Sequence, residues 1–160
     1  KSHPVLRQPL KKPQYLHVGN LRSIDSIFYG DVIVQPEESL GIFADWLKIS
    51  EAALRLTNNL SPYQTLHPGQ IITLRFSSIS RTDFEARRIL FHRETEEDFF
   101  SIFEVINTVK YRVQEGDTLW SICHEKFDIP IWLLKKYNIK LDFQKLYDKQ
   151  QLTIPVIRQL

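Results

Sequence analysis

Tyr111-Arg-Val-Gln-Glu-Gly-Asp-Thr-Leu-Trp-Ser-Ile122 opens the stretch that decides the fold, and this stretch runs to Val156. Its first residues predict a short strand that carries the apolar Val113. A tight turn is expected at Gly116-Asp117, because Gly and Asp are favoured in turns. Thr118 then occupies the position of a helix N-cap, since its hydroxyl can accept a hydrogen bond from a backbone N–H of the first helical turn. The stretch therefore begins as strand, turn and helix.

The rest of the stretch predicts a second helix and a closing strand. Apolar residues recur at helical spacing in two groups: Leu119, Ile122, Cys123 and Phe127, then Leu133, Leu134 and Tyr137. Pro130 suits the first turn of the second helix, where its missing N–H removes no intrahelical bond. Leu152 and Ile154 then alternate as in a half-buried strand. The prediction is a βααβ unit of the α+β class.

These residues carry a resemblance to a known family. Val113-Gln-Glu-Gly-Asp-Thr-Leu-Trp-Ser-Ile122, the central Asn138 and the closing Leu152-Thr-Ile-Pro155 resemble a LysM domain, a carbohydrate-binding module. The opening motif constrains several positions of different chemistry at once. The resemblance implies recognition of glycans that contain N-acetylglucosamine, which means peptidoglycan in bacteria and chitin in eukaryotic systems.

A second copy of the unit lies about 80 residues upstream. Val34-Gln-Pro-Glu-Glu-Ser-Leu40 aligns with Val113-Gln-Glu-Gly-Asp-Thr-Leu119 at an offset of 79. After one inserted residue in the later copy the offset becomes 80, so that Asn58 aligns with Asn138. Ile72 and Leu74 then align with Leu152 and Ile154. Because apolar positions stay in step with a single gap, the chain is predicted to hold two LysM-like units.

The repeat divides the chain into four predicted segments. Residues 1–30 form a basic, Pro-rich linker and a short lead-in, and residues 31–76 the first, degenerate unit. A connecting amphipathic helix occupies 80–109, and the second unit occupies 110–156. Lys1–Gln14 has four basic residues, three prolines and no acidic residue, which favours an extended linker over a docking arm. The apolar residues between 15 and 29 predict at least one short strand or turn that packs on the first unit.

The connecting segment predicts one long helix, about Asp83–Phe103. Thr82 and Glu85 fit a capping box at its start. Phe84, Arg88, Phe91, Phe99, Phe103 and Ile106 then recur at three- and four-residue steps. A stripe this rich in Phe indicates a packing surface. We expect the helix to pack against one or both units and to set their relative orientation. A homodimer interface through Phe84–Phe103 is the alternative.

The resemblance also implies where sugar would bind: between the loop after the first strand and the loop after the second helix. In the second unit these residues are Gly116, Asp117, Thr118, Leu119, Ile139, Lys140, Leu141 and Asp142. The first unit offers a weaker second site at Glu37, Glu38, Ser39, Leu40, Asn59 and Leu60. In that unit the Gly-Asp pair is replaced by two carboxylates. In the second unit, Asp148-Lys149 replaces the Pro-Gly turn of the first.

Two of the three tryptophans are candidates for a sugar-stacking platform. Trp120 and Trp132 align with Gly41 and Ala52, so the fold does not require an aromatic ring there. Packing against the long helix is favoured over stacking on a sugar for both rings. Trp46 is assigned to the core of the first unit or to its contact with the helix.

Catalytic and metal chemistry is not expected. Neighbouring residues on a helix point about 100° apart, so Cys123 and His124 do not form a nucleophile–base pair, and a buried thiol is predicted. His92 and Glu96 are four residues apart but lack an HExxH pattern; a solvent-facing pair is predicted. The three acidic residues at 96–98 cannot flank a glycosidic bond from one helix. No metal and no cofactor are expected.

Composition sets further bounds. The formal net charge of +2 over 160 residues does not indicate nucleic-acid binding. No apolar run is long enough for a membrane span, and the N-terminal residues lack the apolar core of a secretory signal. Because the chain contains no methionine, we expect a fragment whose signal or anchor has been removed, from a protein of the bacterial periplasm or cell envelope.

The predicted function is non-catalytic binding of peptidoglycan glycan strands through LysM grooves. Two alternatives stay open. One is a scaffold that binds an envelope protein partner without holding sugar, which the Phe-rich helix and the degenerate first loop motivate. The other is the targeting region of a peptidoglycan hydrolase whose catalytic domain lies outside this chain.

Overall fold

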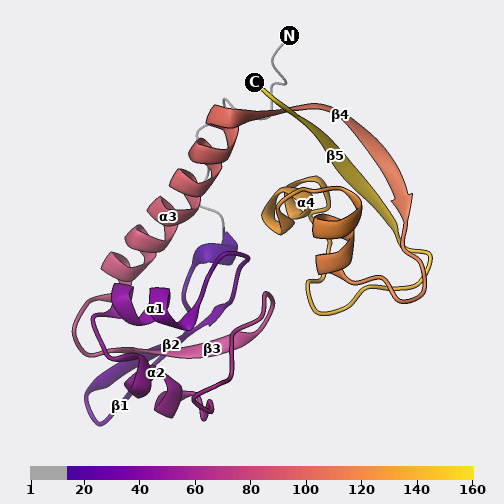
Figure 1. Cartoon of the computed structure of the whole chain (residues 1–160). Helices are drawn as coiled ribbons and strands as arrows, with labels where there is room; N and C mark the ends of the chain where they lie inside the picture. Colours follow the sequence, from indigo (N-terminus) through magenta and orange to yellow (C-terminus); the bar gives the residue numbers. More distant parts are fainter. Residues whose placement is uncertain (1–13) are drawn as a thin grey trace. The chain divides into compact units, whose positions relative to one another are not determined.

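The computed structural model describes residues 14–160, which divide into two compact units over residues 14–95 and 96–160. Figure 1 shows the elements of both units along the chain. The linker predicted for Lys1–Gln14 falls, apart from its last residue, outside the described residues. The mixed α+β class with two βααβ units is confirmed.

The N-terminal unit is built on a three-stranded antiparallel sheet in the order β1-β2-β3. A 3₁₀ turn, Gln14–Leu16, precedes β1 (Gly19–Ile24) and β2 (Ile27–Ile33); α1 (Leu40–Leu47), α2 (Glu51–Thr57) and β3 (Ile71–Phe76) follow. The lead-in segment therefore supplies a complete strand, because β1 pairs with β2 as a hairpin. The Ser39 and Ser50 hydroxyls cap α1 and α2 by accepting the N–H groups of Ile42 and Ala53.

The core of this unit includes the beginning of helix α3 (Arg81–Ile102). Trp46 packs edge-on against Phe43, Phe84 and Phe91, with ring centroids 5.2–5.9 Å apart. Phe84 is fully buried, which leaves it no free surface for the dimer interface that the Phe stripe also allowed. The expected role of Trp46 in the core and in the helix contact is confirmed.

The start of α3 differs from the predicted capping box. Ser80, not Thr82, is the cap, because its Oγ accepts the N–H of Asp83 at 3.0 Å. Glu85 turns inward and accepts the N–H of Val18 at 3.1 Å. The carboxylate therefore fastens the lead-in segment to the helix, and does not cap it.

The C-terminal unit begins with the last turns of α3 and continues directly into β4 (Phe103–Arg112). A π-helix (Ser121–Lys126), α4 (Ile131–Tyr137) and β5 (Gln151–Gln159) follow, and β4 pairs antiparallel with β5 with a bulge near Ile106. The helix predicted over about Asp83–Phe103 is confirmed, but the assignment of the whole segment 80–109 to helix is wrong beyond Ile102. The β-branched residues of 105–109 pair with β5 instead, since β-branched side chains suit a pleated strand.

The end of α3 packs on this second unit. Phe99 and Phe100 lie edge-on to Trp132 of α4, with ring centroids 5.2 and 6.0 Å away, and Lys136 Nζ lies 2.8 Å from Glu96 Oε2. Trp132 is therefore a packing residue, as predicted. The helix contributes to the packing of both units, each by a different part of its length.

The single-residue gap in the repeat explains the π-helix. In α1, Ala44 O accepts the N–H of Ile49, five residues on; its counterpart Cys123 O accepts the N–H of Ile129, six residues on. One extra residue between two fixed ends is accommodated in a helix by a turn of i→i+5 bonds. The insertion seen in the alignment is therefore absorbed without changing the two ends of the helix.

In each unit an aligned asparagine side chain makes the same internal hydrogen bonds. Asn58 Nδ2 donates to Leu54 O and Thr73 O, and its Oδ1 accepts the N–H of Thr73 at 2.7 Å. Asn138 makes the same three bonds with Leu134 and Thr153. Each side chain ties the end of the second helix to the last strand, so the repeat is one of structure as well as of sequence.

Candidate functional site

The first loop of the C-terminal unit is ordered by the Asp117 carboxylate. Its Oδ2 accepts the Tyr111 hydroxyl at 2.6 Å and the N–H of Gln114 at 2.8 Å, while Lys126 Nζ lies 3.0 Å from Oδ1. The hydrogen bonds from Tyr111 and Gln114 lower the pKa of Asp117 below its usual value. All three partners belong to the unit itself, so Asp117 holds the loop in shape.

The neighbours of Asp117 present the loop to solvent. Gly116 is exposed and has a φ of +86°, a conformation that L side chains rarely adopt. Thr118 is also exposed, and it exchanges hydrogen bonds with Ser121: Thr118 Oγ1 accepts the N–H of Ser121, and Ser121 Oγ accepts the N–H of Thr118. The predicted cap is confirmed. Leu119 is half-buried against the core.

The second loop of this unit has one buried member and three exposed ones. Ile139 is 80% exposed, and Lys140 and Asp142 are exposed as well. Leu141 is 4% exposed and belongs to the hydrophobic core. A groove lined by the Leu141 side chain is therefore excluded, and its role is to fix the loop. Leu119 and Leu141 both pack in the hydrophobic core of this unit, so both loops are anchored to the same core.

A half-buried lysine holds the second loop in shape. Lys135 Nζ donates to the carbonyl oxygens of Ile139, at 2.9 Å, and of Leu141. Burial lowers the pKa of Lys135. The ammonium group thereby satisfies backbone carbonyls next to the exposed Ile139.

In the N-terminal unit the equivalent positions are partly closed. Glu38 and Leu40 are buried, whereas Glu37 and Ser39 are exposed. On the opposite loop Asn59 is exposed and Leu60 is packed against the core. Two of the six candidate side chains are thus inaccessible to a ligand.

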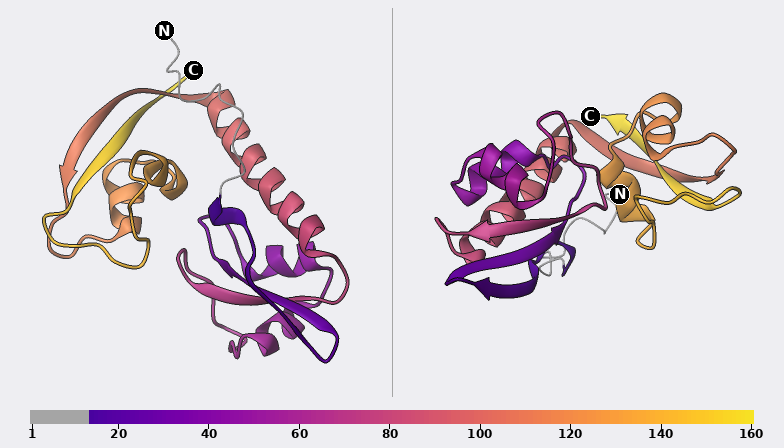
Figure 2. Two further views of the ribbon diagram at one scale, coloured as in Figure 1. Left: turned by 180° about the vertical axis from the view of Figure 1, so that it is seen from behind. Right: turned by 90° about the horizontal axis from the view of Figure 1, so that it is seen from below.

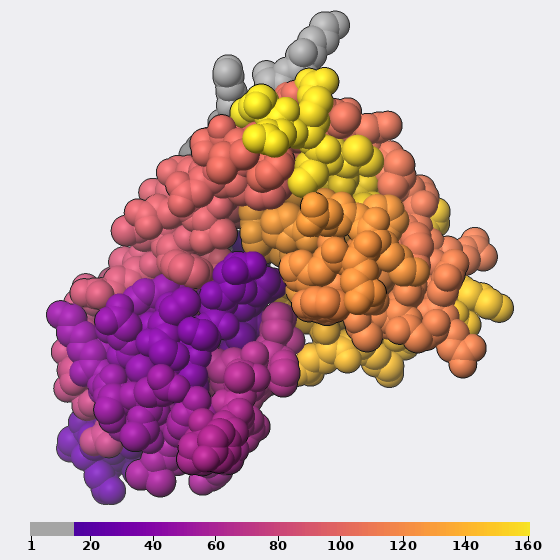
Figure 3. Space-filling model, viewed as in Figure 1, coloured from indigo at the N-terminus to yellow at the C-terminus, as the bar shows by residue number. Residues whose placement is uncertain are grey.

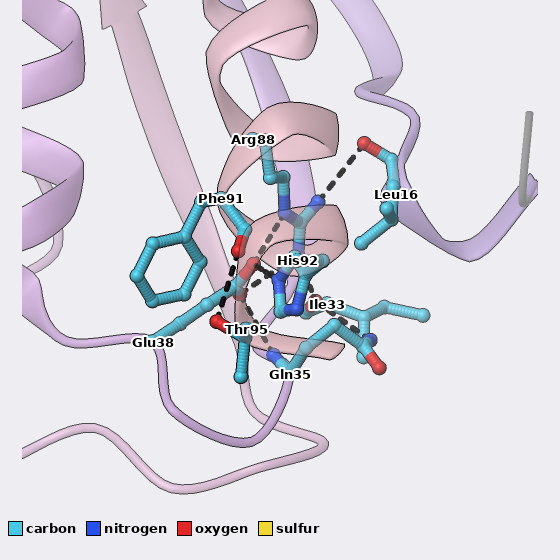
Figure 4. Close-up of polar contacts among 8 residues, drawn as sticks. All are labelled: Leu16, Ile33, Gln35, Glu38, Arg88, Phe91, His92 and Thr95. Atoms are coloured by element: carbon cyan, nitrogen blue, oxygen red, sulfur yellow. Dashed lines mark hydrogen bonds and ion pairs between the residues drawn. The ribbon is translucent and has the colours of Figure 1, made fainter. Parts of the chain in front are cut away.

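The closure comes from an ion cluster between this loop and α3 (Figure 4). Arg88 Nε donates to Glu38 Oε1 at 2.6 Å and Arg88 Nη2 to Oε2 at 2.9 Å, with both side chains fully buried. His92 Nε2 lies 2.7 Å from Glu38 Oε1. The N–H of Gln35 binds Oε2 at 2.8 Å. Every oxygen of the carboxylate has at least two partners.

Arg88 also reaches the chain on either side of β1 and β2. Its Nη1 and Nη2 donate to Leu16 O at 3.1 Å and Ile33 O at 2.7 Å. Burial alone would raise the pKa of Glu38, but the hydrogen bonds from His92 and Arg88 outweigh it and hold the pKa below its usual value. The cluster locks the lead-in, the first loop and α3 into one body.

Two members of this cluster were not predicted as functional. Arg88 occupied an apolar position of the Phe84–Phe91 spacing, which was the available signal that its side chain points inward. His92 and Glu96 do not pair, contrary to the prediction: His92 contacts Glu38, and Glu96 contacts Lys136. Both residues turn toward the unit that holds their part of the helix.

The two remaining candidates, Cys123 and Trp120, differ in their exposure to solvent. Cys123 is fully buried, and burial raises the pKa of its thiol to about 12. Trp120 is 58% exposed beside His124, with ring centroids 5.3 Å apart. Packing of Trp120 against the long helix, favoured from the sequence, is thus not what the structure shows.

Across residues 14–160 the structure holds no group of three or more His, Cys, Asp or Glu side chains placed for a metal ion. No helix in that range is both long and apolar enough to cross a membrane.

Two spore cortex-lytic enzymes are similar to the chain among solved structures. SleL of Bacillus cereus is 21% identical, with a TM-score of 0.29 over 80% of this chain and 23% of that chain. SleL of Bacillus megaterium is 17% identical, with a TM-score of 0.28 over 79% of this chain and 22% of that chain. The chain thus spans less than a quarter of either enzyme. None of the curated proteins matches it.

The LysM domain family matches the chain twice, over residues 32–75 and 111–155. The two matches coincide with the two βααβ units and with the loops described above, and together they cover more than half of the chain. The chain belongs to the LysM domain family.

Proposed function

We propose that the C-terminal unit binds N-acetylglucosamine-containing glycan strands of peptidoglycan, without catalysis, in the bacterial cell envelope or periplasm. The observation that carries the proposal is the contrast between the two first loops. Gly116 and Thr118 are exposed, and Asp117 between them is held by a partly exposed lysine. In the N-terminal unit Ser39 is exposed like Thr118, but Glu37 replaces the glycine, and Glu38 is held in a buried cluster with Arg88 and His92 of α3.

The C-terminal loops suit a sugar that carries an amide. Gly116 has no side chain to keep a ligand from the backbone, and the Thr118 hydroxyl can both donate and accept hydrogen bonds. Ile139 offers an exposed apolar surface to the C–H face of a pyranose, and Lys140 and Asp142 provide polar groups beside it. Because Asp117 and Lys135 already hold the two loops, little ordering is required on binding.

The N-terminal unit has a different proposed role. Because Glu38 and Leu40 are buried, the first loop of this unit stabilises the fold around α3. The residues left to contact a glycan there are Glu37, Ser39 and Asn59. A scaffold role, with a protein partner on this unit or elsewhere, is the second candidate. The targeting of a hydrolase domain outside the chain is a further possibility that full-length sequence would resolve.

The repeat provides a matched pair of variants for the test. Thr118→Arg and Ser39→Arg each remove an exposed N-cap hydroxyl at equivalent positions of the two units. Both lose about 1 kcal/mol of helix stability, but only Thr118→Arg places a long side chain over the proposed site. Co-sedimentation with purified sacculi and titration with a chitin tetrasaccharide measure binding.

The expected result is that wild type and Ser39→Arg bind both ligands and Thr118→Arg binds neither. Ile139→Arg, at an 80% exposed position, is expected to weaken binding without loss of stability, with Leu56→Arg of the N-terminal unit, equally exposed, as its control. If wild type stays in the supernatant, the glycan proposal fails. If Ser39→Arg alone abolishes binding, the site lies in the N-terminal unit.

A further inference from the structure

The outer face of the N-terminal sheet carries a polar contact across all three strands. Arg22 Nη2 of β1 lies 3.0 Å from Asp31 Oδ1 of β2, and Thr73 Oγ1 of β3 donates to the same oxygen at 2.9 Å. Arg22 Nη2 also donates to Thr73 Oγ1 at 3.3 Å. A cation, an anion and a hydroxyl on neighbouring strands thus satisfy one another.

The C-terminal sheet has only two members of this arrangement, and the charge is reversed. Lys110 of β4 aligns with Asp31, and Thr153 of β5 aligns with Thr73. Lys110 Nζ donates to Thr153 Oγ1 at 2.6 Å. Within residues 14–160 no strand stands where β1 stands in the other unit, since the sheet contains β4 and β5 alone (Figure 2).

Within the described part of the chain, the backbone edge of β4 has no pairing strand at the same positions. Val113 exchanges hydrogen bonds with the β5 side, because its N–H reaches Gln150 O and its carbonyl accepts the N–H of Lys149, both at 2.8 Å. By the alternation of an antiparallel ladder, Arg112, Lys110 and Thr108 direct their backbone groups away from β5. Figure 3 shows the β4 side chains in view along the rim of this unit.

In the N-terminal unit these edge positions are covered. Tyr29 and Asp31, the counterparts of Thr108 and Lys110, pair with Arg22 and Gly19 of β1. On β4 the N–H of Thr108 is bound by the Asn107 side chain at 2.8 Å. Among residues 14–160, the groups of this edge without a backbone partner are the N–H and C=O of Lys110 and Arg112 and the C=O of Thr108.

We propose that this edge of β4 docks an extended, acidic segment of a partner protein, which adds antiparallel to β4 as β1 adds to β2 and places a carboxylate beside Lys110. The charge of Lys110 and Arg112 determines the occupant, because opposite charges on neighbouring strands attract and like charges repel. A second copy of β4 would bring four cationic side chains together on one face. Cationic edges discourage such self-pairing.

The test uses capped peptides of the β1 sequence, residues 19–24, with the ¹⁵N-labelled chain as receptor. One peptide carries Arg22→Glu, and the other is unchanged. Amide shift changes are expected at Lys110 and Arg112 with the Glu peptide, which should bind roughly two- to five-fold more tightly than the Arg peptide. Lys110→Glu in the receptor should reverse the preference, because it restores the charge arrangement of the N-terminal unit.

Hydrogen exchange of the free chain provides an independent check. The Lys110 and Arg112 amides should exchange fast, whereas that of Asp31, which is covered by β1, should be protected. Slow exchange of Lys110 and Arg112 in the free chain would show that the edge is already occupied and would overturn the proposal. So would equal binding of the two peptides, or shift changes confined to residues other than those of β4. Glycan binding is measured separately with Thr118→Arg, so the two proposals fail independently.

Discussion

The two units of this chain share one frame but differ in where each is strained. In the first loop, Glu37 has a φ of +72° where the C-terminal unit has Gly116 at +86°. In the turn before the last strand the relation is inverted: Gly69 at +89° corresponds to Lys149 at +64°. The backbone path is thus kept by both copies, with glycine in only one of them at each turn. The path is imposed by the surrounding frame, since a left-handed non-glycine residue is unfavourable on its own.

The largest difference lies in how the equivalent carboxylates are held. Glu38 and Asp117 occupy the same position of the repeat and accept the N–H of Gln35 and Gln114, respectively, each at 2.8 Å. The cation for Glu38 comes from α3 and is fully buried, whereas the cation for Asp117 comes from the unit's own helix and is partly exposed. One unit therefore depends on the connecting helix in a way that the other does not.

Of the substitutions that test this difference between the units, Arg88→Met should reduce the stability of the chain most. It leaves the buried Glu38 without its main partner, and removal of one member of a buried pair destabilises by about 3–5 kcal/mol. Urea unfolding, followed by hydrogen exchange in β2 and α1, measures the loss. Lys126→Met is the matched control at the exposed pair, where only a small change is expected. Equal losses in both variants would contradict the asymmetry.

The two asparagine side chains, in contrast, should contribute equally to the stability of their units. Asn58→Ala and Asn138→Ala each remove three hydrogen bonds of the same geometry. Each leaves backbone groups of the last strand unpaired, which costs about 1–3 kcal/mol. Hydrogen exchange in β3 and β5 reports on each unit separately. A loss confined to one unit would mean that the repeat is not energetically equivalent.

Glycine substitutions at the strained turns should stabilise the chain slightly. Glu37→Gly and Lys149→Gly each relieve a left-handed non-glycine residue, which is worth about 1–2 kcal/mol. The greater conformational entropy of glycine in the unfolded chain costs about 0.5–1 kcal/mol, so a net gain of up to about 1.5 kcal/mol remains. Thermal melts of the two variants test this, with Gly116→Ala expected to shift the melt in the opposite direction. A fall in melting temperature for both glycine variants would show that the strain is absent.

The pH dependence should be the smallest and most local effect. The folded-state pKa of Glu38 lies below its ordinary value of 4.5, so its contribution to stability is present above that value and is lost as pH falls through the folded pKa. The protection factors of amides in β2 and α1, which are corrected for the intrinsic exchange rate at each pH, should therefore fall on acidification below about pH 4.5. Asp117→Asn should leave this acid sensitivity of the N-terminal unit unchanged. Constant protection factors across that range would contradict the role of the Glu38–Arg88 ion pair.

Local pattern predicted much of this molecule. The spacing of apolar residues indicated both helices and the last strand of each unit, and the cap at Thr118 followed from its side chain alone. The aligned asparagines and the single gap were visible in the repeat. The helix end at about Phe103 was predicted to within one residue. The strand that follows was missed, because it is decided by pairing with β5, a partner some fifty residues away.

At the candidate site, too, some features follow from the sequence and others only from the tertiary structure. The sequence by itself determined the family, the two loops and their order, because a LysM domain can be identified from a short motif and its repeat. Only the tertiary structure decided which loop residues are accessible: it buries Leu141, Leu40 and Glu38, and it closes the first loop with Arg88 and His92. An arginine at an apolar position of a helix is ambiguous in sequence, since its meaning depends on which carboxylate from elsewhere in the chain folds against it. Burial of a charge is stable only with such a partner, and that partner is supplied by long-range packing.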